Sequence, residues 1–330
     1  MSEILKDKVA IVTGSGQGVG RAVAIGFAKL GAKIVTNNRK PGSTGNAMVT
    51  DEQFAALSDE RKEWYRKAVA DNEGDAATTA QAIRLAGGEA VHCFADISKF
   101  EDAERLVQTA VDTFGRVDIV VNVAGCFGFS NIDEISEELW DKVNSTKPKG
   151  YFNVIRFAVP YMKKQGGGRI INCTSRSFMG DVIKHAEYCA ANAGVVGLTR
   201  AAAIELWPFG ITCNAFSPFA RTRAAYEMDV VSAMSEDPIL ASGRRIPPSY
   251  ETTPLPESIV PFLAYLASDG AADVSGSVFS IVGNRISLHA EPIPCRSMSK
   301  LGSEYWTVEE IEAEAKRALF NDYKSIARLN

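Results

Sequence analysis

The sequence has few histidines, no closely paired cysteines and no long apolar run. It contains three histidines and six cysteines among 330 residues, and no Cys-x-x-Cys pair or mixed cluster offers a metal site. The cysteines are scattered through apolar segments, which is typical of reduced, mostly buried thiols in the cytoplasm. No apolar stretch approaches the roughly 20 residues of a membrane-spanning helix, and residues 1–8 are too polar for a signal peptide. We therefore expect a cytoplasmic protein that binds neither a metal nor a membrane.

The chain also lacks a strong charge of either sign, an internal repeat and a low-complexity segment. Its formal net charge is −4, with 46% hydrophobic and 23% charged residues, which is the composition of an ordinary globular protein. This charge gives no reason to expect nucleic acid as a partner. A length of 330 residues allows one large α/β domain or two smaller ones.

Strand and helix patterns alternate at the start of the chain. Residues 8–13 (KVAIVT) have the composition of a buried strand, and a glycine-rich turn follows at 14–20. Residues 21–30 then form an amphipathic helical pattern, and a second strand pattern covers 32–36. This order predicts a βαβ unit, whose helix offers free N–H groups and a positive dipole end to a pyrophosphate.

The glycine-rich turn has the pattern Thr-Gly-x-x-x-Gly-x-Gly, formed by Thr13, Gly14, Gly18 and Gly20. A glycine lets the backbone approach a phosphate where any Cβ atom would clash. The spacing differs from the common Gly-x-Gly-x-x-Gly pattern. Its position between a strand and a helix nevertheless predicts a dinucleotide site.

A second motif lies in the middle of the chain. Residues 169–173 form another short apolar strand pattern, and Ser175 follows at its carboxyl end. Tyr188 lies on the first turn of an alanine-rich helical pattern, and Asn192 is one turn further along the same face. A hydroxyl and a phenol in these positions suit the binding of a carbonyl oxygen. A capping serine and an ordinary half-buried tyrosine explain the segment equally well when it is taken alone.

Together with Asn122-Val-Ala-Gly125, these motifs resemble those of the short-chain dehydrogenase/reductase superfamily over roughly residues 5–290. The resemblance implies a single Rossmann-type α/β domain with a doubly wound parallel sheet. It also implies a nicotinamide cofactor and a Ser–Tyr pair that acts on an alcohol or ketone. Residues 211–223 and 277–292 further resemble the 3-hydroxyacyl-CoA dehydrogenase modules of peroxisomal multifunctional enzymes.

We expect a catalytic domain over residues 1–288 and a C-terminal extension over 289–330. The extension contains one clear helical pattern at 307–319, with Thr307 as its N-cap. Residues 219–256 are rich in Pro, Gly and charge, which predicts an irregular, mobile substrate lid.

An apparent insertion follows the second strand. Members of the superfamily usually cross to the next helix in a few residues, whereas here residues 41–73 intervene, with a charged helical pattern at 51–70. The insertion begins where the adenosine end of the cofactor is expected. A flap over the cofactor, a subunit contact and a passive surface decoration are all consistent with it.

The expected site departs from the usual pattern of the superfamily at two positions. Most members carry a Lys four residues after the Tyr and an Asn in the fourth helix, but here Asn192 and Lys147 occupy those positions. This exchange resembles the ketoreductase domains of polyketide and fatty-acid synthases, with their Tyr-x-Ala-Ala-Asn sequence and a Lys three residues before a Gly. Tyr188-Cys-Ala-Ala-Asn192 and Lys147-Pro-Lys-Gly150 match both patterns. The alternative for Lys147 is a solvated surface lysine, and the matched change at position 192 favours a functional role.

The resemblance implies that Ser175, Tyr188, Lys147 and Asn192 are the catalytic residues. A free phenol has a pKa of about 10 and is poorly matched to proton transfer at neutral pH. A nearby ammonium group favours the phenolate, whichever helix carries the ammonium. Ser175 would donate a hydrogen bond to the substrate oxygen as charge develops on it, and Asn192 would complete a proton relay.

The end of the second strand indicates which cofactor is preferred. NAD-preferring members hold an acidic residue there for the ribose diol, whereas here Asn38 is followed by Arg39. A guanidinium without the carboxylate suits a 2′-phosphate, so NADP is favoured over NAD. The alternative is that Arg39 anchors the insertion. The resemblance places these residues at the cofactor: Gly14, Gln17, Gly18, Val19, Gly20, Asn38, Arg39, Asp96, Ile97, Asn122, Ala124, Gly125, Pro218 and Thr222.

The function expected is hydride transfer between a nicotinamide cofactor and a ketone or secondary alcohol. A 3-oxoacyl or 3-hydroxyacyl thioester, or another bulky apolar molecule, is the expected small-molecule substrate. The alternative is a non-catalytic dinucleotide-binding subunit that regulates or completes a partner enzyme. By resemblance, we expect a homodimer or homotetramer formed through the fourth and fifth helices.

Overall fold

The computed structural model describes residues 3–42, 49–180, 182, 184–234, 250–290, 294–300 and 305–322. The chain divides into two compact units, Met1–Leu288 and His289–Asn330. The larger unit contains the sheet and the candidate site residues.

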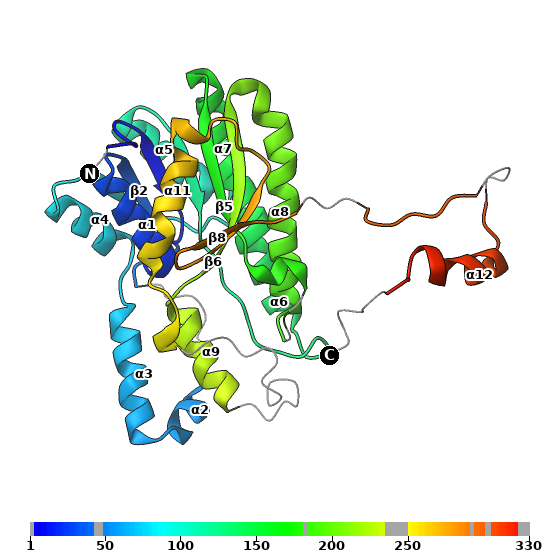
Figure 1. The fold of residues 1–330 in the computed structure, drawn as a ribbon. Coiled ribbons are helices and arrows are strands. Elements are labelled where there is room, and N and C mark those ends of the chain that lie inside the picture. Colours follow the sequence, from blue (N-terminus) through cyan, green and yellow to red (C-terminus); the bar gives the residue numbers. More distant parts are fainter. Residues whose placement is uncertain are drawn as a thin grey trace. The chain divides into compact units, whose positions relative to one another are not determined.

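An eight-stranded sheet with the order β3-β2-β1-β4-β5-β6-β7-β8 forms the centre of the larger unit (Figure 1). Neighbouring strands from β3 to β7 are parallel, and β8 pairs antiparallel with β7. The strand order reverses between β1 and β4, which is where doubly wound folds bind their ligands. The predicted fold class is confirmed. The strands are β1 (Val9–Val12), β2 (Lys33–Asn38), β3 (Ala90–Phe94), β4 (Ile119–Asn122), β5 (Gly168–Cys173), β6 (Ile211–Phe219), β7 (Val278–Val282) and β8 (Arg285–Leu288).

Helices cover both faces of the sheet, with α1, α4 and α11 on one face and α5, α7 and α8 on the other (Figure 1). Successive residues of β1 alternate between the two apolar layers, so that Ala10 and Val12 belong to one and Val9 and Ile11 to the other. Burial on both faces explains why central strands such as β1 (VAIV) and β4 (IVVN) are nearly continuous apolar runs. The helices are α1 (Gly18–Lys29), α2 (Asp51–Ala56), α3 (Asp59–Asp71), α4 (Ala76–Leu85), α5 (Phe100–Phe114), α6 (Glu137–Asn144), α7 (Gly150–Gln165), α8 (Ala186–Leu206), α9 (Arg223–Ala233), α11 (Val260–Ala267) and α12 (Val308–Ala318).

The long fourth helix of the sequence pattern is interrupted. A π-helical turn, Ser145–Lys149, separates α6 from α7 and contains Pro148. Proline has no N–H to donate, so the regular ladder of α-helical hydrogen bonds cannot continue through it. Lys147 lies in this wider turn, directly before the proline, and is buried.

The inserted segment contains two helices rather than the single one predicted. The chain breaks at Leu57 and Ser58, where the Ser58 hydroxyl accepts a hydrogen bond from the backbone N–H of Arg61 and begins α3. The two ends of the insertion meet, because the Gly42 N–H donates to the Asp75 carboxylate at 3.3 Å.

Part of the predicted lid is regular. The stretch 219–256 was expected to be irregular, but α9 (Arg223–Ala233) is a helix, and its residues Tyr226, Val230 and Val231 are buried. Packing against the insertion supplies the partner that makes this helix stable. Residues 235–249, which belong to the same predicted lid, lie outside the described residues.

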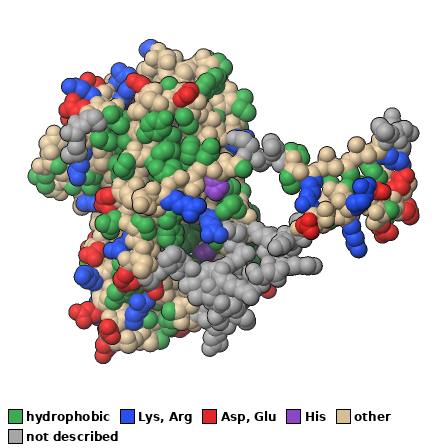
Figure 2. Space-filling model, in the orientation of Figure 1, with side chains coloured by type: hydrophobic (Ala, Val, Ile, Leu, Met, Phe, Trp, Pro, Cys, Tyr) green, Lys and Arg blue, Asp and Glu red, His purple; other side chains and the backbone are tan. Residues whose placement is uncertain are grey.

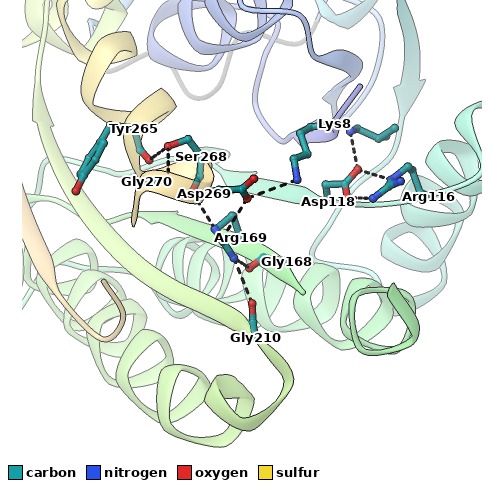
Figure 3. A network of polar contacts seen from close by, with 11 residues as sticks. Lys8, Arg116, Asp118, Gly168, Arg169, Gly210, Tyr265, Ser268, Asp269 and Gly270 are labelled. Atoms are coloured by element: carbon teal, nitrogen blue, oxygen red, sulfur yellow. Dashed lines mark hydrogen bonds and ion pairs between the residues drawn. The ribbon is translucent and has the colours of Figure 1, made fainter. Parts of the chain in front are cut away.

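A polar network joins the amino ends of the central strands, opposite the edge where the candidate site lies (Figure 3). The Asp118 carboxylate accepts hydrogen bonds from the backbone N–H of Val9 and from the Arg116 guanidinium. Nearby, Asp269 lies 3.6 Å from both Lys8 and Arg169. These contacts tie β1, β4 and β5 together at this edge of the sheet.

The smaller unit contains α12, which matches the helix predicted at 307–319. Its N-cap is Thr307, whose hydroxyl and the Glu310 carboxylate form a reciprocal capping box. Across the described parts of the chain, none of the helices has the length and apolarity to cross a membrane. The same parts contain no group of metal-ligating side chains, and all six cysteines are free.

Candidate active site

A cleft of about 330 Å³ opens at the carboxyl ends of the strands. Its walls come from the glycine-rich turn and the start of α1, the end of β2, the loop after β4, the π-helical turn, Tyr188 and the start of α9. Doubly wound folds bind ligands at this edge, next to the point where the strand order reverses.

The glycine-rich turn forms a cradle with no room for side chains. Gly14 has φ +63°, and a Cβ atom added there would lie 2.7 Å from the Ala124 backbone. Gly18 has φ +50° and begins α1, whose first turn contains no acidic residue and whose N-cap, Gln17, makes no side-chain cap. The amino end of α1 therefore suits an anion. A dinucleotide pyrophosphate fits this cradle.

Thr13 holds the opposite wall of the cradle in place. Its hydroxyl accepts hydrogen bonds from the backbone N–H groups of Val123 and Ala124, at 3.0 and 3.2 Å. The Asn122 side chain is fully buried and donates to Asn172 at 2.9 Å. Asn122 therefore supports the wall from behind, while Ala124 and Gly125 line the cleft.

The end of β2 presents Arg39 to the cleft. Asn38 also lines it, but its side chain is occupied: the amide oxygen accepts from the Ala76 N–H at 2.7 Å and the amide nitrogen donates to the Lys40 carbonyl at 3.0 Å. Asn38 thus links β2 to the start of α4. Arg39 is exposed, and its guanidinium is the charged group that the end of β2 presents to a ligand in the cleft.

Asp96 and Ile97 line the cleft beyond β3. Asp96 does not cap α5, which begins at Phe100 with Lys99 as its N-cap. The Asp96 carboxylate instead accepts hydrogen bonds from the N–H and hydroxyl of Ser98. It stabilises the turn that precedes the helix.

Lys147 is buried, with 2% of its surface exposed. Its ammonium group donates a 3.0 Å hydrogen bond to the Cys173 carbonyl and lies 5.4 Å from the centre of the Tyr188 ring. Its methylenes pack beside Gly125, where an added Cβ atom would lie at 3.5 Å, which is ordinary van der Waals contact. The surface-lysine interpretation of Lys147 is therefore wrong, whereas Lys149 is exposed.

Tyr188 lies on the first turn of α8 and lines the cleft, as its position in the sequence predicted. Asn192 is fully buried behind it, and its amide nitrogen donates to the Tyr188 carbonyl at 2.8 Å. Among the residues that the structure describes, none hydrogen-bonds to the amide oxygen of Asn192. A buried acceptor of this kind normally binds water.

Ser175 follows β5, and its hydroxyl accepts a hydrogen bond from the backbone N–H of Ser177 at 3.3 Å. Neither Ser175 nor Asn192 is among the residues that line the cleft, and the same holds for Asn122 and Pro218. The remaining residues expected at the site do line it: Gly14, Gln17, Gly18, Val19, Gly20, Asn38, Arg39, Asp96, Ile97, Ala124, Gly125, Lys147, Tyr188 and Thr222.

A second tyrosine lies beside Lys147 and was not anticipated from the sequence. The Tyr151 hydroxyl is within hydrogen-bonding distance of the carbonyls of Ala124, at 2.9 Å, and Cys173, at 3.3 Å. Burial raises the pKa of Tyr151 well above its ordinary value. Tyr151 therefore remains a neutral donor that orients the backbone around the ammonium group.

The sequence also gave no signal for several other residues that line the cleft. Lys142 and Thr146 lie on α6 and the π-helical turn, one helical turn apart. Glu227 of α9 is 2% exposed and pairs with Arg223 at 2.8 Å. Glu227 lies in the segment expected to be irregular, so no helical spacing pointed to it.

Comparisons with known proteins agree with this geometry. The family model described as short chain dehydrogenase matches residues 53–229. A Thermotoga maritima protein named as an uncharacterized oxidoreductase is 32% identical over 277 residues, which is 84% of this chain and 96% of the relative. The hydroxyacyl-CoA dehydrogenase ChsB1 of Mycobacterium tuberculosis is 33% identical over 317 residues, which is 94% of this chain and 87% of the relative.

A peroxisomal multifunctional enzyme type 2 of Drosophila melanogaster is 32% identical over 86% of this chain, which spans 40% of that longer enzyme. The crystal structure of a short chain dehydrogenase from Mycobacterium avium superposes with a TM-score of 0.73 at 30% identity, covering 96% of both chains. The protein therefore belongs to the short-chain dehydrogenase family and is an oxidoreductase that uses a nicotinamide cofactor. The predicted family and class of enzyme are confirmed.

Proposed function

We propose that the protein reduces a ketone, or oxidises the corresponding secondary alcohol, with NADP(H), and that its substrate is a 3-oxoacyl or 3-hydroxyacyl thioester. The position of the Lys147 ammonium group beside Tyr188 is the observation that carries the proposal. The names of ChsB1 and of the peroxisomal multifunctional enzymes support the substrate class.

Tyr188 is the proton donor for reduction and, as phenolate, the base for oxidation. Lys147 stabilises the phenolate by its charge, and burial of the lysine strengthens that interaction because less solvent screens it. The Cys173 carbonyl holds the ammonium group in position. Ser175 donates to the substrate oxygen in this proposal, and Asn192 holds a water that returns a proton to the phenol.

The cofactor, when bound, supplies or accepts the hydride. The glycine cradle and the amino end of α1 hold its pyrophosphate, and Arg39 binds the 2′-phosphate of NADP. The absence of a carboxylate at position 38, together with the engaged side chain of Asn38, supports NADP over NAD.

Spectrophotometric assays with purified protein test the proposal. Oxidation of NADPH is measured with a panel of simple ketones and 3-oxoacyl thioesters, for the wild type and for Tyr188→Phe. We expect turnover of the thioesters that is lost in Tyr188→Phe, with the fold and cofactor binding retained. A wild type that binds NADPH but turns over no member of the panel would favour the non-catalytic interpretation.

A homodimer or homotetramer in the cytoplasm remains part of the proposal. Exposed apolar side chains on α7 and α8, such as Phe152 and Ile204, support subunit contacts there. A second apolar surface gathers around α11 (Figure 2) and includes Tyr265. Two separate surfaces suit a tetramer, which sedimentation equilibrium distinguishes from a dimer.

A further inference from the structure

The inserted segment packs against α9 through aromatic side chains (Figure 1). The Tyr65 ring lies edge-on to Tyr226 with the ring centres 5.3 Å apart, and Trp64 meets Tyr250 in the same way at 5.7 Å. Aromatic pairs of this geometry stabilise packing beyond the area they bury. The insertion is therefore packed against α9, a helix whose first residues line the cleft.

Polar contacts fix the same packing. The Arg61 guanidinium donates to the Asp229 carboxylate at 3.0 Å and stacks on the Trp64 ring at 3.9 Å. The Asn72 amide donates to the Tyr250 hydroxyl at 3.1 Å. Such a set of directional contacts argues against a passive surface decoration.

The helix α9 lies between the insertion and the cleft. Arg223 and Glu227 line the cleft, whereas Tyr226, Val230 and Val231 belong to the apolar clusters that the insertion completes. The insertion is thus one helix away from the space in which a substrate lies.

The loop after β4 reaches the insertion directly. Phe127 lines the cleft with its ring centre 5.2 Å from that of Tyr188. Phe129, two residues further, packs in the same apolar cluster as the insertion. The His185 ring contacts both phenylalanines, with ring centres 5.5 and 5.4 Å away.

We call the apolar cluster that Phe129 shares with the insertion the end wall. The members used below are Phe54, Leu57, Tyr65, Phe129 and Val230.

We propose that the end wall limits the length of the apolar chain that a substrate can carry past Phe127. The inference rests on the proposed function, in which Tyr188 acts on a carbonyl bound in the cleft. The end wall does not line the cleft itself. In this inference an alkyl or acyl chain leaves Tyr188 along Phe127 and His185 and reaches Phe129, the wall member that the His185 ring contacts. The insertion then determines which chain lengths the enzyme accepts, because fitting extra methylenes against a packed apolar wall causes strain.

Two truncations of the wall test this inference, Phe129→Ala from the loop and Leu57→Ala from the insertion. The assay compares kcat/KM for 3-oxoacyl thioesters of increasing chain length and for 2-alkanones of increasing length. We expect the optimum to move to longer chains in both variants, with the ratio of long-chain to short-chain kcat/KM rising about tenfold. The dissociation constant for NADPH should not change. Lys67→Ala, on an exposed position of α3, is the matched control and should keep the wild-type profile.

Thermal unfolding identifies any truncation that damages the fold, and Phe129→Leu, which removes less volume, then provides the test. An unchanged length profile in a folded variant overturns the inference, and so does an equal loss of activity at every length. Inactivity of the wild type toward both series overturns the proposed function instead. Wild-type activity toward 2-alkanones alone overturns only the thioester assignment. The effect of chain length on kcat/KM is then compared with the 2-alkanones.

Discussion

Lys147 and Tyr188 come from different helices, yet the lysine Nζ atom lies 5.4 Å from the centre of the tyrosine ring. A lysine at position 192 would reach the same phenol from its own helix, one turn away. Lys147 instead approaches from the π-helical turn between α6 and α7. The reaction requires a cation near the phenol. Here the cation comes from the π-helical turn rather than from α8, the helix that carries Tyr188.

Lys147→Ala should lower kcat by about a hundredfold near neutral pH, because the phenolate loses the charge that stabilises it. The dissociation constant for NADPH should be largely retained. In the oxidation direction, activity should recover partly at high pH, where solvent removes the phenol proton. A pH profile of kcat checks this. Lys149→Ala, an exposed neighbour, is the control, and wild-type rates in Lys147→Ala would exclude a catalytic role.

Arg39→Ala should weaken binding of NADPH by roughly ten- to a hundredfold, since a charge-assisted hydrogen bond is worth about 1.5–3 kcal/mol. Binding of NADH, which lacks the 2′-phosphate, should change little. Fluorescence titration with both cofactors measures the difference. Lys40→Ala, the neighbouring exposed cation, controls for general charge. Equal weakening of both cofactors would show that Arg39 does not read the 2′-phosphate.

Burial lowers the pKa of His185 from its ordinary value of 6.5, against the opposing effect of Glu187. The unfolded chain then takes up a proton at higher pH than the folded chain, so the free energy of unfolding falls as the pH drops below about 6.5. For one proton the slope is at most about 1.4 kcal/mol per pH unit. His185→Phe should flatten this dependence in urea titrations at several pH values. His92→Gln, at an exposed position, should retain it.

Asp118→Ala should reduce the free energy of unfolding by about 2 kcal/mol, because the backbone N–H of Val9 and the Arg116 guanidinium both lose their acceptor. Activity at moderate temperature should remain, since the network in Figure 3 lies at the opposite edge of the sheet from the cleft. Asp269→Ala is the comparison. Its side chain is 82% exposed, and exposed ion pairs contribute little. Similar losses in both variants would contradict the importance of burial at Asp118.

The sheet and the cofactor cradle could be predicted because their signals are local. Every parallel strand contains a short apolar run, and the glycines of residues 14–20 directly follow one of these strands. The position of Lys147 could be inferred only by pairing it with the change at Asn192. It is buried within the π-helical turn, and no propensity of the residues 145–149 identifies such a turn.

Elements that depend on distant partners could not be predicted. The helix α9 has a weak apolar stripe of its own and is stabilised by α3, which lies far away in the sequence. The break at Leu57 and Ser58 lets α2 and α3 follow separate directions toward that surface. The roles of Asn38 and Asp96 in tying loops also depend on atoms that only the fold brings near.

The hydrogen bond between the Gly42 N–H and the Asp75 carboxylate shows that the two ends of the insertion lie side by side. A segment whose two ends meet can be gained or lost in a single insertion or deletion, and the strands on either side keep their register. If the end wall sets the size of the substrate, one such event would change the range of substrates while leaving the catalytic residues untouched. Related enzymes of different specificity could therefore arise in one step rather than through many substitutions around Tyr188.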